Sequence, residues 1–304
     1  MRILLTGGHG FIGRALVPLL RAQGHEVLAP RRGESGFPAD LAALDGWADW
    51  PDRLDAVAHL AALNPERGDA ASRDDAALMR ANVAATKALA ERAVRSGARR
   101  FVLASTLLVH PFSPAPIRED SPTAPQNSYA ASKLAAETAL RRAVEGSATG
   151  GTVLRLAPVY GEGGRGGVHA LLRLAQGPLP LPFGGGARRS FLSRRNAADA
   201  IAFALTDERA AGETFLVADS EALRIGDFVA RARKLQGRSP RLVTLPGGLL
   251  RAAARALGKG EVHDRLFAGL EADTTRLRRA GWTPPRTLDE GLRDALSGSA
   301  SQRS

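Results

Sequence analysis

Short apolar runs alternate with helical patterns through the first half of the chain. The runs that predict buried strands are 2–6, 26–29, 56–60, 101–104 and 152–156. Between them, residues 11–23 and 79–96 repeat apolar positions with helical periodicity. Strands that alternate with helices are typical of βαβ units on a parallel sheet. The pattern predicts an α/β fold with a doubly wound parallel sheet.

In the second half of the chain, predicted strands and helices alternate less regularly. Residues 111–126 and 161–186 are rich in proline, glycine and polar residues, so we expect loops there. Helical periodicity at 196–205 and 225–235, with an apolar run at 213–218, predicts two more helices and one more strand.

The absence of cysteine in this 304-residue chain excludes disulfides, thiolate metal sites and a cysteine nucleophile. We expect no metal centre and a reducing, cytoplasmic location. The apolar start of the chain is too short for a signal sequence, and no stretch reaches the roughly 20 apolar residues of a membrane span. We therefore expect no membrane association.

The formal net charge of +11 raises the question of a nucleic-acid partner. Most basic residues are arginines spread along the whole chain, and there is no zinc-finger spacing and no stripe of basic and aromatic residues. We expect no nucleic-acid partner. A few of these arginines would suffice to bind a phosphorylated small molecule.

Three glycines, Gly7, Gly10 and Gly13, lie between the first predicted strand and the first predicted helix. The first glycine permits a tight turn, the second lets a pyrophosphate approach the backbone, and the third lets helix and strand pack closely. The N–H groups of the helix start, at Phe11 and Ile12, would then face the phosphates. This arrangement predicts a Rossmann-type dinucleotide site.

The end of the second predicted strand bears on the choice of cofactor. An acid there suits the ribose 2′-hydroxyl of NAD, whereas arginine suits the 2′-phosphate of NADP. The strand runs into Arg31 and Arg32 with no acid, which favours NADP. NAD stays open, because Glu34 follows closely.

Tyr129 and Lys133 are four residues apart in a predicted helix and therefore share one of its faces. A nearby ammonium and an oxidised nicotinamide both favour the phenolate, so the pair beside a bound cofactor predicts a lowered tyrosine pKa and a proton-exchanging group. A hydroxyl at the end of the fourth predicted strand would bind the substrate oxygen. Thr106 is the first candidate for this hydroxyl and Ser105 the second.

These motifs together resemble the extended short-chain dehydrogenase/reductases, the NAD-dependent epimerase/dehydratase family, in its nucleotide-sugar 4-epimerase and 4-ketoreductase branch. Residues 6–13, 59–62 and 155–161 look like the family's glycine turn, HLAA strand end and RLxNVYGPG segment. The sequence departs from the family pattern at Ala85, where glycine is usual, and at Pro158, where asparagine is common. The resemblance implies cofactor contacts by Asp40, Leu41, Leu60, Ala61, Ala62, Asn82, Tyr129, Lys133 and Pro158.

The resemblance extends into the last third of the chain, where Arg189 matches an arginine that grips a nucleotide diphosphate. It implies a UDP-linked sugar as substrate, with Thr106, His110, Arg189 and Arg265 as substrate contacts, and it allows a homodimer. His110 stands where the family often has tyrosine.

The motifs also suggest how the chain is divided. We expect residues 1–160 to form the dinucleotide-binding domain, to which 191–217 returns. Residues 161–304 would form mainly a smaller C-terminal substrate-binding region, with 297–304 as a disordered tail.

The reaction class is narrowed by Leu107 and Leu108, which stand where the family's dehydratases carry an Asp-Glu pair. Aliphatic side chains cannot act as acid and base, so we expect no 4,6-dehydratase. Epimerisation at C4 and reduction of a 4-ketone both stay open. The alternatives are an NADPH-dependent reductase of a non-sugar ketone and a non-catalytic NAD(P)-binding regulatory or assembly protein.

Overall fold

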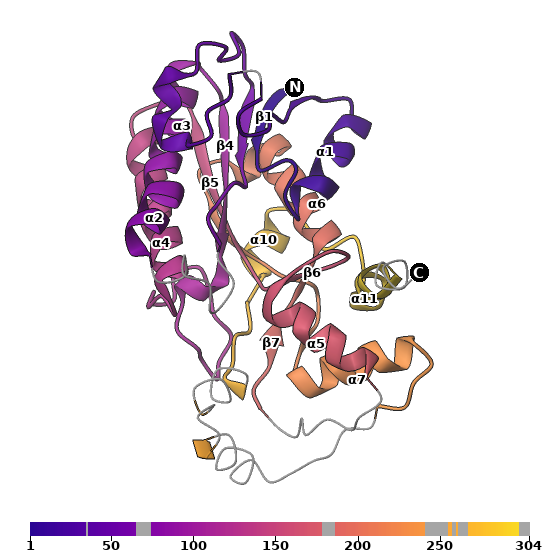
Figure 1. Ribbon diagram of the computed structural model, residues 1–304. Helices are drawn as coiled ribbons and strands as arrows, with labels where there is room; N and C mark the ends of the chain where they lie inside the picture. The colour runs from indigo at the N-terminus through magenta and orange to yellow at the C-terminus, as the bar shows by residue number, and fades with distance from the viewer. Residues whose placement is uncertain are drawn as a thin grey trace.

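The computed structural model describes residues 1–34, 36–64, 74–177, 186–240, 255–256, 260 and 267–297. A six-stranded parallel sheet in the order β2-β1-β3-β4-β5-β9 forms its centre (Figure 1). Its strands are β1 (Arg2–Thr6), β2 (Glu26–Leu28), β3 (Ala56–His59), β4 (Arg100–Thr106), β5 (Gly150–Leu156) and β9 (Thr214–Val217). The strand order changes direction at β1, because β2 lies on one side of it and β3 on the other. Open α/β sheets bind ligands at such a switch point, outside the carboxyl ends of the strands.

Helices cover both faces of this sheet (Figure 1). On one face lie α2 (Asp75–Leu78), the π-helical turn η3 (Met79–Ala84), α3 (Ala85–Arg95) and α4 (Ser128–Val144). On the other face α1 (Gly13–Ala22) packs against α6 (Arg194–Thr206). Short 3-10 turns complete this part at η1 (Leu41–Gly46), η4 (Leu107–Val109) and η5 (Glu208–Ala210). The predicted doubly wound parallel sheet is confirmed.

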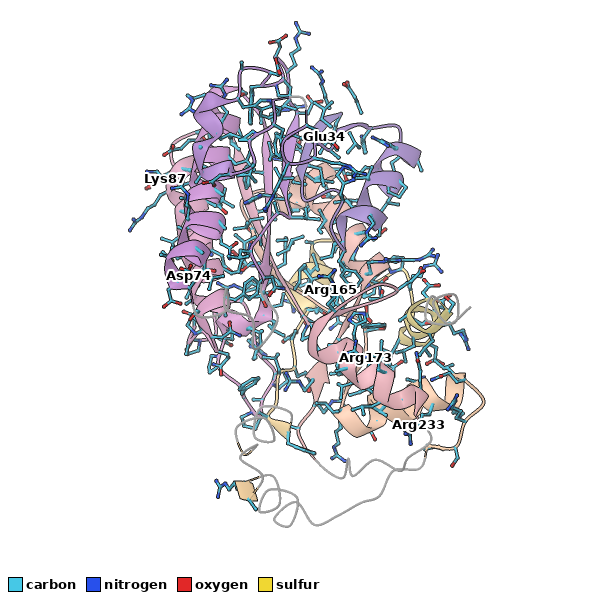
Figure 2. The ribbon with its side chains drawn as sticks, in the orientation of Figure 1. Glu34, Asp74, Lys87, Arg165, Arg173 and Arg233 are labelled. Atoms are coloured by element: carbon cyan, nitrogen blue, oxygen red, sulfur yellow. The ribbon has the colours of Figure 1, made fainter. Side chains whose placement is uncertain are left out.

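A smaller body lies beyond the carboxyl edge of the sheet (Figure 1). Its helices are α5 (Gly166–Gln176), α7 (Ile225–Leu235) and α11 (Leu288–Ser297). Its strands pair as β6 (Val159–Tyr160) with β8 (Leu192–Ser193) and as β7 (Arg189–Ser190) with β10 (Ala222–Leu223). A further helix, α10 (Thr275–Arg279), packs near β9. Arg173 of α5 and Arg233 of α7 lie close together in this body, far from Glu34 beyond β2 (Figure 2).

The smaller body has its own core, built on aromatic rings. Phe191 stacks on Phe228 with 4.1 Å between ring centroids, and Tyr160 meets Phe228 edge-on at 5.6 Å. The Tyr160 hydroxyl donates a 2.7 Å hydrogen bond to Asp219, which also accepts from the Asn196 side chain at 2.7 Å. Asp219 follows β9, so this buried network fastens the smaller body to the edge of the sheet.

Most predicted elements form within a residue or two of their expected bounds, but two regions differ. The helix expected at 79–96 begins earlier, at Asp75, and contains the π-helical turn. The loop expected at 161–186 contains α5, whose apolar face is flanked by a glycine-rich segment that obscured it. Among the residues that the structure describes, no helix is long and apolar enough to cross a membrane.

Candidate active site

The glycine turn joins the end of β1 to the start of α1. Gly7 has φ +76°, and a Cβ there would lie 2.7 Å from the backbone nitrogen of Ala61. A Cβ at Gly13 would lie 2.3 Å from the carbonyl oxygen of Gly7, so both positions need glycine for packing. Gly10 is exposed, and its Cβ would meet only the Gly7 carbonyl oxygen, at 3.0 Å. The fold demands glycine least at position 10, the position at which a pyrophosphate would approach the backbone.

The Phe11 ring points away from the turn toward the smaller body. His169 meets it edge-on at 5.6 Å, and the Arg194 guanidinium lies over it at 5.5 Å. The ring therefore contacts α5 and α6, and only the backbone N–H groups of Phe11 and Ile12 could serve the cofactor role predicted for these two residues. Ile12 precedes α1 in helical conformation.

Arg31 and Arg32 are exposed beyond the end of β2. The Arg31 side chain lies 3.7 Å from Glu34, a weak surface pair. Asp40 caps η1 by accepting from the Ala42 nitrogen at 2.9 Å, and it also pairs with Arg80. These bonds, the backbone one first, lower the Asp40 pKa, so its carboxylate is already engaged within the protein.

The segment after β3 is held between the glycine turn and α4. Leu60, Ala61 and Ala62 are half-buried there, and Leu60 and Ala61 touch the space beside Gly7. Asn82 pins this segment, since its side chain accepts from the Leu63 nitrogen at 2.7 Å and donates to the Leu63 oxygen at 3.0 Å. It also donates to Ser132 of α4 at 2.8 Å. Asn82 thus has a structural role in the site, since it holds the segment after β3 in place.

Helix α4 carries the predicted catalytic pair. It begins where Asn127 accepts from the Ala130 nitrogen at 2.7 Å, a regular N-cap. Tyr129 follows directly and is half-buried, and Lys133 is 2% exposed one turn later. In the described part of the chain, neither side chain forms a hydrogen bond with the other or with Thr106.

Burial dominates the electrostatics of this pair. It raises the pKa of Tyr129 to about 12. The lowering expected from the sequence depends on an oxidised nicotinamide as well as on Lys133 and stays a prediction. Burial also lowers the pKa of Lys133 to about 8, although the negative charge of Glu137 acts in the other direction. Lys133 therefore stays largely protonated at neutral pH, whereas Tyr129 stays a phenol unless another positive charge approaches it.

His59, the first residue of the HLAA segment, was not predicted as a site residue, yet it lies beside Lys133 and bonds the end of β1 from which the glycine turn starts. Its ring is fully buried, and its Nδ1 lies 2.6 Å from the Thr6 hydroxyl at the end of β1. Burial first, and the Lys133 charge second, lower the His59 pKa to about 3, so this imidazole is neutral. Its Nε2 is buried without a hydrogen-bond partner among the described residues.

The two candidate hydroxyls at the end of β4 differ in their surroundings. Thr106 caps η4 by accepting from the Leu108 nitrogen at 3.3 Å, which leaves its own hydrogen available. Ser105 donates its hydrogen to Glu137 of α4 at 2.5 Å. The geometry favours Thr106 as the hydroxyl for a substrate oxygen and gives Ser105 a structural part.

The prediction that His110 contacts substrate disagrees with the structure. The side chain is fully buried, with Nδ1 3.0 Å from the Pro122 oxygen and Nε2 3.0 Å from Arg155. Both ring nitrogens are engaged inside the protein, so the ring cannot reach a ligand where it stands. The sequence could not reveal this, because the partners come from a loop and from β5.

On the side of the smaller body, Arg189 is half-buried on β7. It donates to the Ala268 oxygen at 3.2 Å and lies over the Phe112 ring at 5.4 Å, and burial lowers its pKa to about 10. Pro158 is half-buried just before β6, where its oxygen accepts from the Leu192 nitrogen. Arg265 lies outside the described residues.

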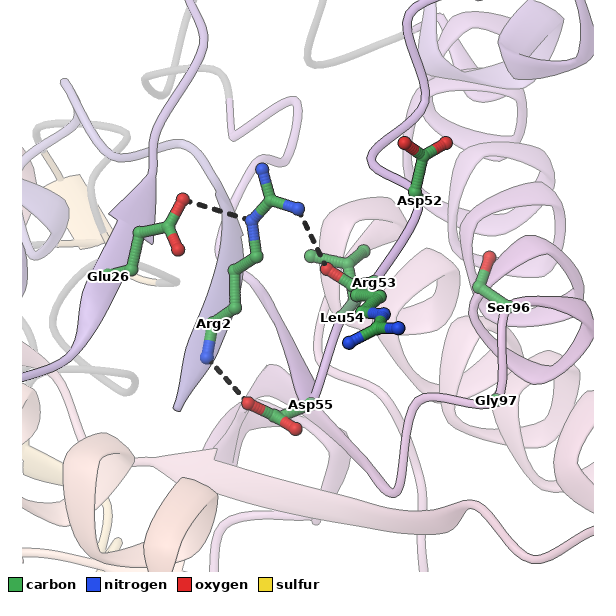
Figure 3. A pocket seen from close by; sticks show the side chains of 8 residues that line it. All are labelled: Arg2, Glu26, Asp52, Arg53, Leu54, Asp55, Ser96 and Gly97. Atoms are coloured by element: carbon green, nitrogen blue, oxygen red, sulfur yellow. Dashed lines mark hydrogen bonds and ion pairs between the residues drawn. The ribbon is translucent and has the colours of Figure 1, made fainter.

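A surface cavity lies at the opposite edge of the sheet, beside the start of β1 (Figure 3). Arg2 at its rim donates from its backbone to Asp55 at 2.7 Å and from its side chain to Glu26 at 3.0 Å. Charges of both signs thus pair with each other there. The cavity lies away from the glycine turn and from α4, and the candidate chemistry does not involve it.

The model of the NAD dependent epimerase/dehydratase family matches residues 3–218. The chain belongs to this family. Membership confirms the predicted family and a nicotinamide dinucleotide as the class of cofactor, whereas the choice of NADP over NAD stays a prediction.

Individual relatives cover nearly the whole chain. It is 28% identical to UDP-glucose 4-epimerase of Vibrio cholerae over 96% of this chain and 93% of that protein. It is 35% identical to 3-diazoavenalumate denitrifying reductase of a Streptomyces species over 93% of this chain and 96% of that protein. The structure of human epimerase family protein SDR39U1 with NADPH has the same fold, with a TM-score of 0.77 at 24% identity, covering 98% and 99% of the two chains.

The position of Gly10 makes the cofactor site testable. In Gly10→Ala we expect the melting temperature to fall less than in Gly7→Ala or Gly13→Ala, because the new methyl group makes one tight contact, at 3.0 Å, with the Gly7 carbonyl oxygen, whereas the other two positions clash at 2.7 and 2.3 Å. The dissociation constant for NADPH or NADH should rise about tenfold or more, equivalent to about 1.4 kcal/mol. Fluorescence titration measures it. The control is Gly167→Ala in α5, where a Cβ meets nothing within 4 Å. Unchanged affinity in Gly10→Ala would contradict the assignment of the turn.

Proposed function

We propose that this protein catalyses NAD(P)-dependent oxidation or reduction at C4 of a UDP-linked sugar. The observation that carries the proposal is the buried face of α4, where Tyr129 and the 2%-exposed Lys133 lie one turn apart. A buried ammonium is costly unless an anion or a dipole compensates it. The Lys133 ammonium lies near His59, which bonds Thr6 at the start of the glycine turn. This position suits a site that a dinucleotide completes.

The residues on the page fit a nicotinamide dinucleotide. The exposed Gly10 would let its pyrophosphate reach the N–H groups of Phe11 and Ile12, and Lys133 would hold a ribose hydroxyl. When bound, the cofactor supplies a nicotinamide ring that accepts or gives a hydride and is positively charged in its oxidised form.

The chain's own side chains would move the proton. Thr106 donates a hydrogen bond that orients the sugar oxygen, and Tyr129 exchanges a proton with that oxygen. Because burial raises the Tyr129 pKa to about 12, Lys133 by itself does not make the phenol acidic. We infer that Tyr129 becomes an effective base only when a second positive charge joins that of Lys133.

Elimination of water is disfavoured at this site. Leu107 is fully buried in η4, and Leu108 is half-buried beside it. The positions that follow Thr106 therefore offer neither an acid nor a base. This supports 4-epimerisation or 4-ketoreduction over 4,6-dehydration.

Epimerisation and reduction would use the same side chains. The relative from Vibrio cholerae, a UDP-glucose 4-epimerase, favours the first and also favours UDP as the nucleotide. Exposed Arg31 and Arg32 favour NADPH and hence reduction.

A second candidate function is an NADPH-dependent reductase of a non-sugar substrate. It is favoured by the 35% identity to 3-diazoavenalumate denitrifying reductase, whose named substrate is not a nucleotide sugar. The binding of UDP at Arg189 separates the two candidates.

The catalytic part of Tyr129 predicts a specific loss. Tyr129→Phe should lower kcat by about 10²–10⁴-fold with UDP-glucose or UDP-galactose, because it removes only the exchangeable proton. The readout is sugar interconversion or absorbance of the reduced cofactor. The matched control is Tyr160→Phe at the other tyrosine, whose hydroxyl serves Asp219 in the smaller body, so stability should fall while kcat of the folded protein persists. Full turnover in Tyr129→Phe would exclude the mechanism.

The cofactor preference predicts a selective effect of the arginines after β2. Replacing Arg31 and Arg32 by alanine should raise the dissociation constant for NADPH about tenfold or more and leave that for NADH unchanged. Arg142→Ala, at an exposed position near the end of α4, is the control for net charge. Tighter binding of NADH than of NADPH by the unaltered protein would reverse the preference.

The nucleotide-sugar substrate predicts a contribution from Arg189. Arg189→Ala should weaken UDP binding about 10-fold to 100-fold, because a charge-assisted bond to a phosphate is lost. Isothermal titration with UDP measures this, and NADPH affinity should not change. The adjacent Arg188→Ala is the control, since that side chain is exposed and pairs with Glu271 at 3.3 Å. No binding of UDP by the unaltered protein would favour the non-sugar reductase.

A further inference from the structure

A buried carboxylate lies one turn beyond Lys133 on α4. The Glu137 side chain is fully buried and accepts four hydrogen bonds from two neighbouring strands and a fifth, at 3.4 Å, from Arg141 one turn further along α4. Arg155 of β5 donates from Nε to both oxygens, at 3.1 and 3.2 Å, and from Nη2 to Oε2 at 2.8 Å. Ser105 of β4 donates to Oε1 at 2.5 Å. One side chain thus ties α4 to both strands.

The outer end of Arg155 fixes the loop that precedes α4. Its Nη1 donates to the Glu119 oxygen at 3.2 Å and lies 3.0 Å from His110 Nε2. Because a guanidinium nitrogen can only donate, His110 Nε2 must accept, and its proton resides on Nδ1, which donates to the Pro122 oxygen at 3.0 Å. Burial lowers the His110 pKa, in keeping with this neutral form.

The cluster has two consequences for the candidate site. Ser105 is adjacent to Thr106, so the Glu137 carboxylate links the helix of Tyr129 and Lys133 to the strand that presents Thr106. The carboxylate is also a buried negative charge on the same helix as Lys133. The charged and titratable groups around Lys133 are Glu137 on α4, which favours its charged form, and neutral His59 on β3. Glu137 in turn pairs with the guanidinium groups of Arg155 on β5 and Arg141 on α4.

We propose that Glu137 is a positioning residue of this active site, which holds α4 in register with Thr106 and supplies the negative charge that keeps Lys133 an ammonium ion. This deepens the proposed function and rests on it. Ser105 and His110 were predicted to contact the substrate, but they belong to the hydrogen-bond cluster around Glu137 and Arg155. Without the carboxylate, the lysine would face only the desolvation that disfavours its charge.

The test uses a double variant, because Glu137→Gln alone leaves the buried Arg155 without a counter-charge and destabilises the fold. In the pair Glu137→Gln with Arg155→Met, both charges leave together, and a melting temperature close to that of the unaltered protein is expected. Lys133 then lacks its counter-charge in a folded protein. The control is Glu91→Gln on α3, which removes an exposed partner of Lys87.

The readout is the titration of Lys133 by NMR of protein labelled with [ε-13C]lysine, which is practical because the chain has only four lysines. In the unaltered protein one lysine should titrate near pH 8, where burial places Lys133. In the double variant this midpoint should fall by about one pH unit, and the alkaline limb of kcat/KM should move with it. Neither should change in Glu91→Gln.

The outcomes separate this proposal from the proposed function. A folded double variant with an unshifted Lys133 midpoint and an unshifted pH profile would overturn the part assigned to Glu137, whatever the substrate is. Full turnover in Tyr129→Phe would overturn the proposed function, while the NMR titration of Lys133 would still report on Glu137.

Discussion

The burial of the Lys133 ammonium is the constraint on which the rest of the site depends. A charged amine at 2% exposure is disfavoured by desolvation, which lowers its pKa to about 8. Three features of the chain accommodate this buried charge. Glu137 supplies a negative charge behind it, His59 stays neutral beside it, and α4 directs it toward the edge of the sheet where the glycine turn lies. A dinucleotide with ribose hydroxyls and phosphates completes this arrangement chemically.

The sheet explains why these groups meet. Parallel strands end at a common edge, and the reversal of strand order beside β1 opens that edge for a ligand. The chain places its glycine turn after β1, His59 at the end of β3 and Thr106 at the end of β4. Glu137 then fixes α4 against β4 and β5, so residues distant in sequence keep a common geometry.

The sequence predicted the parts of this account that depend on local pattern. The strands, the glycine turn and the spacing of Tyr129 and Lys133 follow from periodicity and neighbouring residues. Helix α5 was missed because its flanks are rich in glycine, and the burial that raises the Tyr129 pKa depends on packing that the sequence does not show. The surroundings of His110 depend on contacts across the fold. The sequence could have predicted that Glu137 shares a helix face with Lys133, because it follows Lys133 at helical spacing. No local pattern indicated that Glu137 pairs with Arg155.

The central claim is that Tyr129 becomes a base only when a positively charged nicotinamide joins Lys133. The chain has two tyrosines, so NMR of protein labelled with [ζ-13C]tyrosine gives one signal for each. Titrated alone, Tyr129 should ionise near pH 12, and Tyr160, bonded to Asp219, should not ionise below it. With NADP⁺ or NAD⁺ bound, the Tyr129 midpoint should fall by several pH units while the Tyr160 signal stays unchanged. A Tyr129 midpoint that does not move when the oxidised cofactor binds would contradict the account.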